Sequence, residues 1–541
     1  MRIMLIPPTF HYTERYPAFL SQSDFPTGFA YIAASLSDAG HEVIGVNPNN
    51  IVGYPTAYHM MRDTVIQAIK KHKPDLIGIG GLCTDYAFLK DCLAVIREIE
   101  PKTPVVMGGG IICNDAEFVM NDLKPDYCIV GEAEEAIVKL ADTLNDSNSS
   151  FEKINNLGYW KEGKAVFTKT SISNQSLDNL PFPDYEPFGI KDLMDNYGMA
   201  TRLLYRYPRP YPRVMGIVTA RSCPFTCSFC VHGHRTVPYR ERSIDNIMLE
   251  IKQTYEKYQF NILLILDELF AVNNARMREF CEVLQVWKEK YQWDFDWTFQ
   301  THASAKLDKE TLALAKKTGC FMFSYGLESA SPAVLASMNK KTKPEQVVEA
   351  IKMAGEAGIG FSANLIFGDV AETEETMVDS LSFWMQYGRE AFIFLGTVTP
   401  YPGSKLFDIA LEKGIIPDRK IFYEHIESGY INLTGIPDAD MSLRLRLLEW
   451  LETTWLTARR VTSVRVEQEA WIEGSPMAYF QGWNYKVWAT CPYCGKESLH
   501  RQSIGDTSKP MFIGSGCPSC NKRIRIDIPA ITREVASGQP A

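Results

Sequence analysis

The sequence predicts an α/β protein with three parts in order: a Rossmann-like parallel sheet, a partial (βα)6 TIM-like barrel and a small four-cysteine domain. Three patterns predict this order. Short apolar segments alternate with helical segments up to about residue 145, six more alternate with helices between residues 214 and 427, and two Cys-x2-Cys pairs stand near the C-terminus. Apolar strands that alternate with helices are typical of parallel sheets covered on both faces.

The expected parts have the following limits. They are residues 1–147 for the Rossmann-like domain, 148–205 for a linker and hairpin, 206–430 for the barrel, 431–484 for a helical segment and 485–541 for the four-cysteine domain. A chain of 541 residues has room for about three or four domains.

The composition is that of a core-forming protein without a dominant charge. Hydrophobic residues make up 45% and charged residues 22%, and the net charge is −9. Without a basic excess, nucleic acid is not expected as the main partner. No apolar run approaches the roughly 18 residues of a membrane span. The sequence therefore predicts a cytoplasmic protein, whose reduced thiols are available to bind metal.

Small residues stand at the carboxyl ends of three of the five N-terminal strand segments, where parallel sheets of this kind bind ligands. They would let a wide ligand approach the backbone closely. These residues are Gly80, Gly81, Thr84, Gly108, Gly109 and Gly131. The alternative is that the glycines only end the strands. No Gly-x-Gly-x-x-Gly follows the first strand, so a dinucleotide site is not predicted.

The second large region contains six apolar strand segments, from VMGIVT (214–219) to FIFLGTV (392–398). Helical patterns separate them. Ser243 stands as an N-cap before an apolar period of 3.6 residues, and Pro344 and Gly358 mark the start and end of a later helix. In a barrel of such units, function lies at the carboxyl ends of the strands.

A cysteine triplet follows the first strand of the predicted barrel. Cys223, Cys227 and Cys230 have the spacing Cys-x3-Cys-x2-Cys. Three thiolates can hold three irons of a 4Fe–4S cluster and leave the fourth iron open, whereas electron-transfer clusters use four cysteines. The rival is a zinc ion with His232 or His234 as its fourth ligand.

The tail carries a second cysteine pattern. Cys491 and Cys494 are followed after 22 residues by Cys517 and Cys520, a spacing typical of a four-thiolate zinc site. A rubredoxin-like iron is the rival. Before the tail, leucines at four-residue steps predict a helix from Met441 to Trp471. The aromatic stretch YFQGWNYKVW (479–488) indicates packing or the mouth of a hydrophobic substrate site.

The stretch RSCPFTCSFCVHG (221–233), with an aromatic residue just before its last cysteine, resembles the signature of the radical S-adenosylmethionine (SAM) superfamily. Further stretches resemble the subgroup of that superfamily with an N-terminal cobalamin-binding domain. They are residues 266–284, 323–359, 365–377 and 399–416. The resemblance covers roughly residues 1–430.

The resemblance implies a 4Fe–4S cluster held by the cysteine triplet, with SAM chelated at the open iron. Reductive cleavage of SAM would give a 5′-deoxyadenosyl radical, which abstracts a hydrogen atom from an unactivated carbon. Glu328 and Ser329 match positions that bind SAM in this family, and Gln300 is a weaker match. A solvated loop carboxylate is the alternative for Glu328.

Two residues of the predicted barrel are candidates for catalytic contacts. Glu268 ends a strand together with Asp267, and either carboxylate is placed to meet substrate or cofactor. Tyr325 is a candidate wall of the pocket, with a core aromatic as the alternative.

Cobalamin is expected although one of its motifs is missing. Many cobalamin domains carry Asp-x-His-x-x-Gly, whose histidine binds cobalt from below, and this sequence has none; His11 lacks the aspartate and glycine. We therefore expect no protein imidazole on cobalt. Water, an apolar neighbour or nothing would occupy that side.

The leading function is cobalamin-dependent radical methylation of a carbon centre. A cobalamin-dependent radical cyclase or oxidative rearrangement enzyme is the second hypothesis. A non-catalytic metal-binding adaptor that holds a partner through its four-cysteine domain is the third. The expected partners are a small-molecule or lipid-like substrate and an electron donor such as flavodoxin or ferredoxin.

Overall fold

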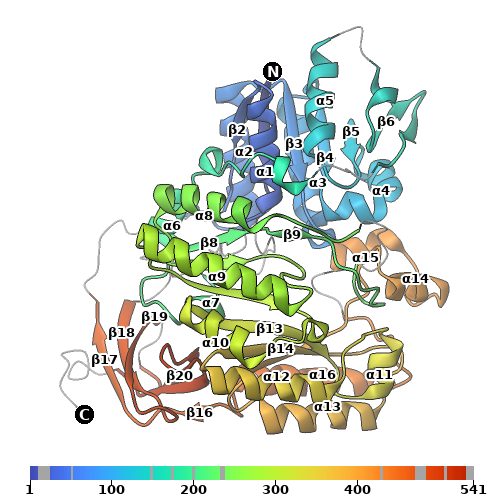
Figure 1. Cartoon of the computed structure of the whole chain (residues 1–541). Coiled ribbons are helices and arrows are strands. Elements are labelled where there is room, and N and C mark those ends of the chain that lie inside the picture. Colours follow the sequence, from blue (N-terminus) through green and yellow to red (C-terminus); the bar gives the residue numbers. More distant parts are fainter. Residues whose placement is uncertain are drawn as a thin grey trace. The chain divides into compact units, whose positions relative to one another are not determined.

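The computed structural model describes residues 1–9, 12, 25–49, 51, 53–146, 150–171, 176–197, 201–231, 238–426, 430–469, 483–504 and 508–531 (Figure 1). The chain forms two compact units, each with its own parallel sheet. The first consists mainly of Met1–Asp195 and Tyr401–Gly429. The second consists mainly of Asn196–Gly233, Pro238–Pro400 and Tyr430–Ala541.

The sheet of the first unit has the strand order β2-β1-β3-β4-β5-β6-β7. Its parallel strands are β1 (Arg2–Ile6), β2 (Glu42–Gly45), β3 (Leu76–Gly80), β4 (Val105–Gly108) and β5 (Tyr127–Ile129). The hairpin β6 (Leu157–Lys161) and β7 (Lys164–Phe167) adds two antiparallel strands at one edge. The order 2-1-3-4-5 is a doubly wound arrangement, with ligands expected at the carboxyl ends.

Helices of the first unit follow the strands in alternation. They are α1 (Thr27–Asp38), α2 (Ala57–His72), α3 (Tyr86–Ile99), α4 (Gly110–Leu123), α5 (Glu134–Asn145) and α6 (Ile190–Tyr197). Every residue of β3 is buried, as expected for a strand covered on both faces.

Two helices from late in the chain also belong to the first unit: α14 (Lys405–Glu412) and α15 (Arg419–His425). Arg419 pairs with Asp115 of α4 at 2.9 Å, and the ring of Tyr423 stacks on Phe118 of α4. The sequence grouped residues 401–430 with the barrel, whereas in the structure residues 401–429 belong to the first unit and make these contacts with its helix α4.

The second unit contains a six-stranded parallel sheet in the order β15-β14-β13-β12-β11-β8. Its strands are β8 (Val214–Ile217), β11 (Ile262–Ile265), β12 (Asp296–Thr301), β13 (Cys320–Glu328), β14 (Gly360–Phe367) and β15 (Phe392–Thr397). β8 and β15 are its edges, so the barrel is partial. The predicted α/β fold class, with six parallel strands here, is confirmed.

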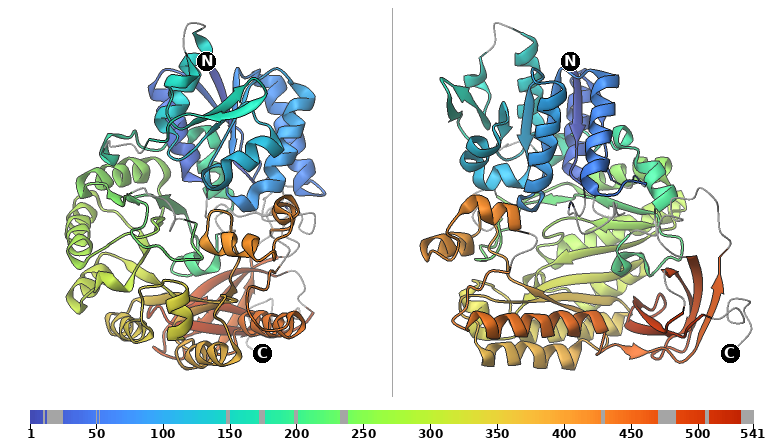
Figure 2. Two further views of the ribbon diagram at one scale, coloured as in Figure 1. Left: turned by 90° about the vertical axis from the view of Figure 1, so that its right-hand side faces the viewer. Right: turned by 180° about the vertical axis from the view of Figure 1, so that it is seen from behind.

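Helices cover the outer face of this sheet; they are coloured green to orange-yellow in Figure 2. They are α8 (Ile244–Tyr258), α9 (Asn274–Tyr291), α10 (Lys309–Lys317), α11 (Pro332–Ser337), α12 (Pro344–Ala357) and α13 (Glu374–Tyr387). Bulky aromatic side chains fill the layer between helices and strands. Trp297 of β12, for example, packs edge-on against Phe280 of α9.

Helix α16 (Asp438–Thr454) runs along β15 and is shorter than predicted. It ends because Trp455 adopts a left-handed conformation with φ +51°. The strands β16 (Arg459–Arg460) and β17 (Val464–Gln468) follow where the sequence predicted helix. The four-residue leucine step identified the helix but not its buried face, because Leu443 and Leu447 are exposed.

The C-terminal part adds two small sheets, β17-β18-β19 and β16-β21-β20. Their remaining strands are β18 (Trp483–Thr490), β19 (Glu497–Ile504), β20 (Met511–Gly516) and β21 (Arg523–Ile528). The short elements α7 (Leu203–Arg206), β9 (Ala220–Arg221) and β10 (Arg240–Glu241) complete this unit.

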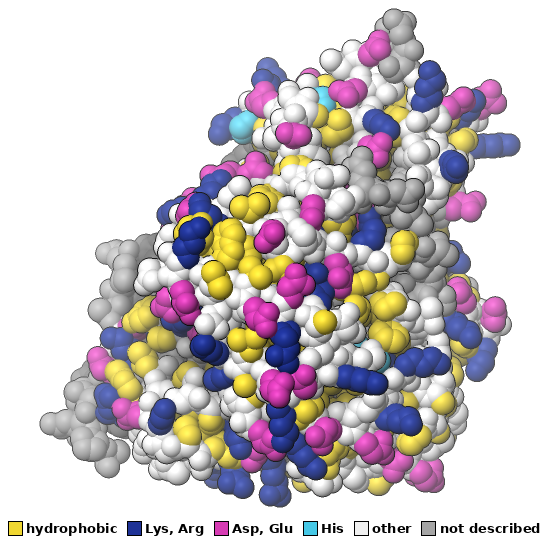
Figure 3. Space-filling model, viewed as in Figure 1, with side chains coloured by type: hydrophobic (Ala, Val, Ile, Leu, Met, Phe, Trp, Pro, Cys, Tyr) yellow, Lys and Arg dark blue, Asp and Glu magenta, His cyan; other side chains and the backbone are white. Residues whose placement is uncertain are grey.

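The surface offers no single-sign field on the face that Figure 3 displays, where acidic and basic side chains are interspersed. Among the described helices, none combines the length and apolar character needed to cross a membrane.

Candidate functional site

The cysteine triplet lies in the loop after β8 and β9. Burial raises the pKa of the Cys223 thiol and raises that of Cys227 to about 11. The loop is anchored on the chain after α11: the Ser228 N–H donates to the Met338 carbonyl at 2.9 Å, and the Asn339 side-chain amide donates to the Thr226 carbonyl at 3.0 Å. The loop therefore has a defined path before any cluster binds.

A buried polar group fixes the strand end that carries this loop. Asp267 accepts hydrogen bonds from the Thr219 N–H, at 2.6 Å, and from the Thr219 hydroxyl. Burial raises the pKa of Asp267 to about 7. Arg242, which forms a buried ion pair with Glu250, donates to the Val218 carbonyl at 2.9 Å. Asp267 is thus committed to the fold, which leaves Glu268 as the candidate of that pair.

Glu328 ends β13 in a left-handed conformation with φ +66°, which is rare for a residue with a side chain. Its carboxylate pairs with Lys340 Nζ at 3.1 Å, and the two side chains are only 11% and 9% exposed. Gly326 makes room for this pair, because a Cβ there would lie 2.5 Å from Lys340 Nζ.

Lys340 places a buried positive charge near the cysteine triplet. Burial lowers its pKa, but the charge of Glu328 and of the Cys227 and Cys223 sulfurs outweighs burial, so the net pKa is raised. The sequence analysis missed this residue. No local signal reveals it, because its charge acts on thiols that lie more than 100 residues earlier in the chain.

The two other predicted SAM contacts are engaged within the fold. The Ser329 hydroxyl is buried, lies 3.2 Å from the Ser380 hydroxyl and accepts from the Ser331 N–H at 3.1 Å. The Gln300 side-chain amide donates to the Asp267 carbonyl at 3.0 Å, which ties β12 to the end of β11.

Tyr325 lies on the helix-facing side of β13. Its ring is 3% exposed and packs edge-on against Phe323 and Phe361. The neighbouring residue Ser324 faces the inside of the barrel instead. The structure therefore gives Tyr325 the surroundings of a core aromatic and does not bring it to the barrel interior.

His302 is a further residue that sequence reasoning missed. Its imidazole stacks on Phe225 of the cysteine loop, with 4.0 Å between ring centroids. Its ring nitrogens bond the Thr342 hydroxyl at 2.9 Å and the Ser304 N–H at 3.1 Å. Burial lowers the pKa of His302 to about 4, so it is neutral at pH 7 and supports the loop by packing.

A cavity of about 580 Å³ lies inside the barrel. Its wall includes three polar residues that are direct neighbours across the sheet, Gln300, Ser324 and Ser362. Bulky branched side chains usually fill the interior of such barrels. Small polar residues here leave space for a ligand. We call this cavity the barrel chamber.

The carboxyl edge of the first unit's sheet separates the predicted glycines into two kinds. A Cβ on Gly80 would lie 2.7 Å from the Gly108 carbonyl oxygen, and one on Gly109 (φ +87°) would lie 2.6 Å from the Gly81 carbonyl oxygen. A Cβ on Gly108 or Gly131 would meet no atom within 4 Å. Gly108 and Gly131 therefore border open space, Gly80 and Gly109 let the strand ends pack together, and Gly81 makes room for the Asp85 side chain.

The remaining predicted position at this edge, Thr84, lies partly buried in a short 3-10 turn (Cys83–Asp85). Leu82, the residue before this turn, is 62% exposed. His11, His232 and His234 lie outside the described residues, so the histidine alternatives at both sites stay untested.

The four C-terminal cysteines converge on one point. Cys491 Sγ lies 3.7 Å from Cys520 Sγ, and Cys494 Sγ lies 3.7 Å from Cys517 Sγ. Metal–sulfur bonds of about 2.3 Å in a tetrahedron give sulfur–sulfur edges of about 3.8 Å. The quartet therefore has the dimensions of a tetrahedral metal site.

The quartet differs from the triplet in spacing. Within the described chain, it is the group of metal-binding side chains whose ligand atoms all lie within 4.8 Å of one another. The triplet after β8 is not gathered in this way.

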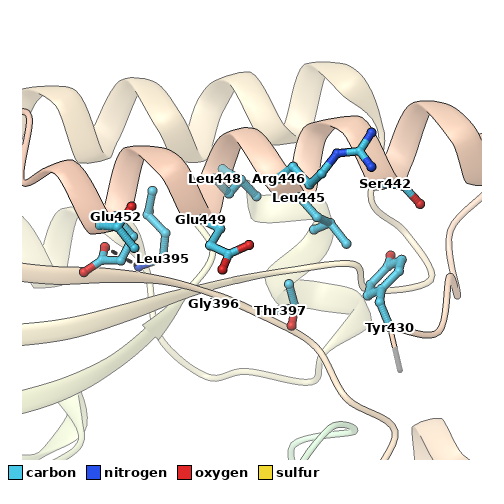
Figure 4. A pocket seen from close by; sticks show the side chains of 11 residues that line it. Leu395, Gly396, Thr397, Tyr430, Ser442, Leu445, Arg446, Leu448, Glu449 and Glu452 are labelled. Atoms are coloured by element: carbon cyan, nitrogen blue, oxygen red, sulfur yellow. Dashed lines mark hydrogen bonds between the residues drawn. The ribbon is translucent and has the colours of Figure 1, made fainter. Parts of the chain in front are cut away.

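A second cavity, of about 480 Å³, lies between β15 and α16 (Figure 4). At one end of it, Glu452 accepts a hydrogen bond from the Leu395 N–H of the edge strand at 3.0 Å. This bond joins the C-terminal end of α16 to the barrel.

Comparison with known proteins agrees with this geometry. The family model of the B12 binding domain matches residues 23–141, and that of the radical SAM superfamily matches residues 217–383. The chain is 26% identical to an uncharacterized methyltransferase of Pyrococcus horikoshii, over 77% of this chain and 84% of that protein. It is 24% identical to the anaerobic magnesium-protoporphyrin IX monomethyl ester cyclase of Cereibacter sphaeroides, over 75% of this chain and 63% of the cyclase.

Among solved structures, the fold is similar to that of TsrM from Kitasatospora setae, a radical SAM methyltransferase solved with cobalamin and a [4Fe-4S] cluster. The TM-score is 0.59, with 17% identity over 77% of this chain and 75% of that one. These matches define the class of the protein as a radical SAM enzyme. Within this class, the chain belongs to the enzymes that carry a B12-binding domain, as the motifs indicated.

Proposed function

We propose that this enzyme methylates a carbon centre of a small-molecule substrate by radical SAM chemistry that depends on cobalamin. The observation that carries the proposal is one chain with both a B12-binding domain and a radical SAM domain, similar over most of its length to a methyltransferase. When bound, the cluster, SAM and cobalamin supply a carbon-directed radical and a transferable methyl group.

Cys223, Cys227 and Cys230 are the proposed ligands of the 4Fe–4S cluster. Their half-buried loop, fixed by Ser228 and Asn339, presents three thiols, which would hold three irons of the cluster and leave the fourth for SAM. The Lys340 ammonium offsets the negative charge that builds up when these thiols ionise. A 4Fe–4S cluster, rather than a zinc ion, is the metal group that we propose for the Cys-x3-Cys-x2-Cys spacing of these residues.

Glu328 is the proposed contact for SAM, and Lys340 is the residue that positions it. The left-handed turn at Glu328 and its ion pair hold the carboxylate at the carboxyl end of β13. Ser329 supports this site indirectly, by accepting a hydrogen bond from the Ser331 N–H in the turn after β13. Gln300 supports it by tying β12 to the end of β11 through its hydrogen bond to the Asp267 carbonyl. Glu268 is the proposed carboxylate contact at the end of β11.

The carboxyl edge of the first unit's sheet is the proposed cobalamin site. Gly108 and Gly131 leave open space for a wide, flat ligand, and Gly80 and Gly109 allow the backbone of neighbouring strand ends to pack closely at this edge. Since the sequence has no Asp-x-His-x-x-Gly, no imidazole of that motif is available to the cobalt.

We assign zinc to the four-cysteine site, in a structural role. Two thiolate pairs on facing hairpins at tetrahedral spacing support this assignment. A cytoplasmic electron donor such as flavodoxin or ferredoxin is the proposed source of the electron that SAM cleavage consumes.

The test uses SAM labelled in its methyl group, incubated with the reduced holoenzyme and an extract of cells that lack the enzyme. The label is expected in a new carbon–methyl bond of one extract compound. Formation of 5′-deoxyadenosine and a changed compound without label would support the cyclase alternative instead. Absence of any SAM cleavage would support the adaptor alternative.

A further inference from the structure

The barrel chamber has an uncharged interior. Among its described lining residues, Arg202 next to α7 is the one side chain that is charged at pH 7, and it is exposed rather than buried in the wall. An ion placed against the buried part of this wall would lose hydration without finding an opposite charge, at a large cost. The chamber therefore favours an uncharged molecule.

Three polar groups on neighbouring strands line one side of the chamber. The hydroxyls of Ser324 and Ser362 and the amide of Asn364 make no hydrogen bond within the described part of the chain. Of the three residues, Ser362 is buried and Ser324 half-buried, and buried polar groups are normally paired. A hydroxyl, carbonyl or amide of a ligand would satisfy these three groups.

The rest of the wall is apolar and ends at Trp455. Leu264 and Leu266 line one side, Phe392 and Phe394 the other. The indole of Trp455 meets Phe392 edge-on, with 6.4 Å between ring centroids. Trp455 therefore belongs to the apolar end of the chamber, near the amino ends of the strands.

The C-terminal module holds Trp455 in place. Arg523 of β21 is fully buried, lies with its guanidinium 4.2 Å from the Trp455 ring and donates to the Gly388 carbonyl at 3.2 Å. Gly514 of β20 packs directly against the indole of Trp455. A side chain would not fit there, because a Cβ on Gly514 would overlap Trp455 Cε2. Such contacts keep a bulky residue in the left-handed conformation.

Asn521, the residue after the metal-site cysteine Cys520, makes a second contact between the C-terminal module and the same end of the barrel. Its N–H donates to the Cys517 carbonyl at 2.8 Å. Its side chain donates to the Gly358 carbonyl at 3.0 Å and accepts from the Tyr207 hydroxyl at 3.0 Å. Tyr207 in turn stacks on Phe392. The geometry of the cysteine turn thus sets the position of the chamber's end.

We propose that the barrel chamber is the substrate pocket, that it takes an uncharged molecule with one hydrogen-bonding group and an apolar end, and that Trp455 is the floor that limits the length of this end. The four-cysteine module acts as the support of that floor. This inference rests on the proposed function, since it names the class of substrate for the same enzyme.

The experiment places a reporter in the chamber. In the holoenzyme variant Ser362→Cys, the labelling rate of this thiol by N-ethylmaleimide is measured by peptide mass spectrometry. The probes are 1-octanol, octanoate and octylammonium at equal concentration. At about four times its dissociation constant, octanol should slow labelling about fivefold. Equal protection by all three probes, or protection by none, overturns the proposal.

A control reports on non-specific effects. Leu249→Cys places a thiol on the exposed side of α8, away from the chamber. The probes should leave its labelling rate unchanged. If octanol slows labelling at both positions alike, its effect is not binding in the chamber, and the proposal fails.

The role of Trp455 as the floor is tested by comparing protection by alcohols of different chain length. In Ser362→Cys with Trp455→Ala, 1-dodecanol should protect as well as 1-octanol, while with Trp455→Phe it should remain the weaker probe. Cys520→Ser, with its metal content measured, should speed labelling of the Ser362→Cys thiol about tenfold because the floor loosens. An unchanged preference for octanol in Trp455→Ala refutes the floor.

These readouts do not involve methyl transfer. If the labelled methyl group of SAM never reaches carbon while octanol protects the Ser362→Cys thiol, the proposed function fails and the pocket stands. The reverse result leaves the function and removes the pocket.

Discussion

Replacing Lys340 by methionine removes the one charge that the structure pairs with Glu328. Both side chains are about nine-tenths buried and their charged atoms are 3.1 Å apart. Methionine keeps the length of the aliphatic chain, so packing changes little. The variant leaves a buried carboxylate without its cation and takes a positive charge away from the cysteine triplet.

The size of the effect follows from that geometry. At an effective dielectric constant of about 20, unit charges at this distance attract by about 5 kcal/mol, and desolvation of both groups offsets part of this. Breaking such a buried pair from one side typically costs about 3–5 kcal/mol. For a unit of this size, each kcal/mol lowers the melting temperature by about 2 °C, so a fall of roughly 6–10 °C is expected.

Anaerobic differential scanning calorimetry of the holoenzyme measures this fall. Lys309→Met is the matched control, because Lys309 and Glu356 form a pair at 2.7 Å whose side chains are 68% and 59% exposed. The control should change stability by less than about 0.5 kcal/mol. Equal melting temperatures for both variants would refute the role given to the buried pair.

Two further predictions concern other parts of the molecule. Gly108→Val fills open space at the strand end, so the affinity for cobalamin, followed by absorbance titration, should fall at least about tenfold while stability is kept. Gly109→Val should lower stability instead, because its Cβ would lie 2.6 Å from the Gly81 carbonyl oxygen; the same result for both variants would contradict the assignment. Asp267→Asn tests a pH effect. Burial raises the folded-state pKa of Asp267 from 3.8 to about 7, so its stabilising contribution is complete below 3.8 and is lost as pH rises towards 7. The decrease in melting temperature between pH 5 and 8 should therefore be smaller in Asp267→Asn than in the parent, and identical pH profiles would rule this out.

The strands, and the position of the cysteine triplet among them, could be predicted from the sequence because the apolar runs and the turn residues that bound them are local features. Apolar runs such as 262–265 and 320–328 are bounded by turn residues, and both became buried parallel strands. The position of the cysteine triplet after the first barrel strand follows from chain order alone. The alternation of apolar strands with helices was therefore enough to predict the fold class. Together with chain order, it also predicted at which end of the barrel the triplet lies.

Which face a barrel strand turns inward was not readable in the same way. In β13, Tyr325 and Ser324 are neighbours, and a strand buried on both faces shows no polar–apolar alternation to tell them apart. From the sequence, Tyr325 was a candidate pocket wall with a core aromatic as the alternative, whereas in the structure Ser324 lines the chamber. The end of α16 was missed for a related reason: a tryptophan, not a glycine, takes the left-handed conformation there, and only tertiary contacts hold it.

Residues that act through long-range contacts were also missed. Lys340 and His302 reach the cysteine loop from segments more than 70 residues further along the chain, and no spacing rule connects them. Single-sequence reasoning finds ligands with a motif but not the charges and rings that support them.

The central claim is that the triplet after β8 supports reductive cleavage of SAM. The direct measurement is 5′-deoxyadenosine formed by the anaerobically reconstituted enzyme with dithionite and SAM, compared between the parent and Cys230→Ala, with iron and zinc analysed in both. The account predicts product from the parent, about four irons per chain in the barrel, and neither in the variant, whose zinc content stays unchanged. Equal product from both proteins, or none from a parent with its full iron content, would contradict it.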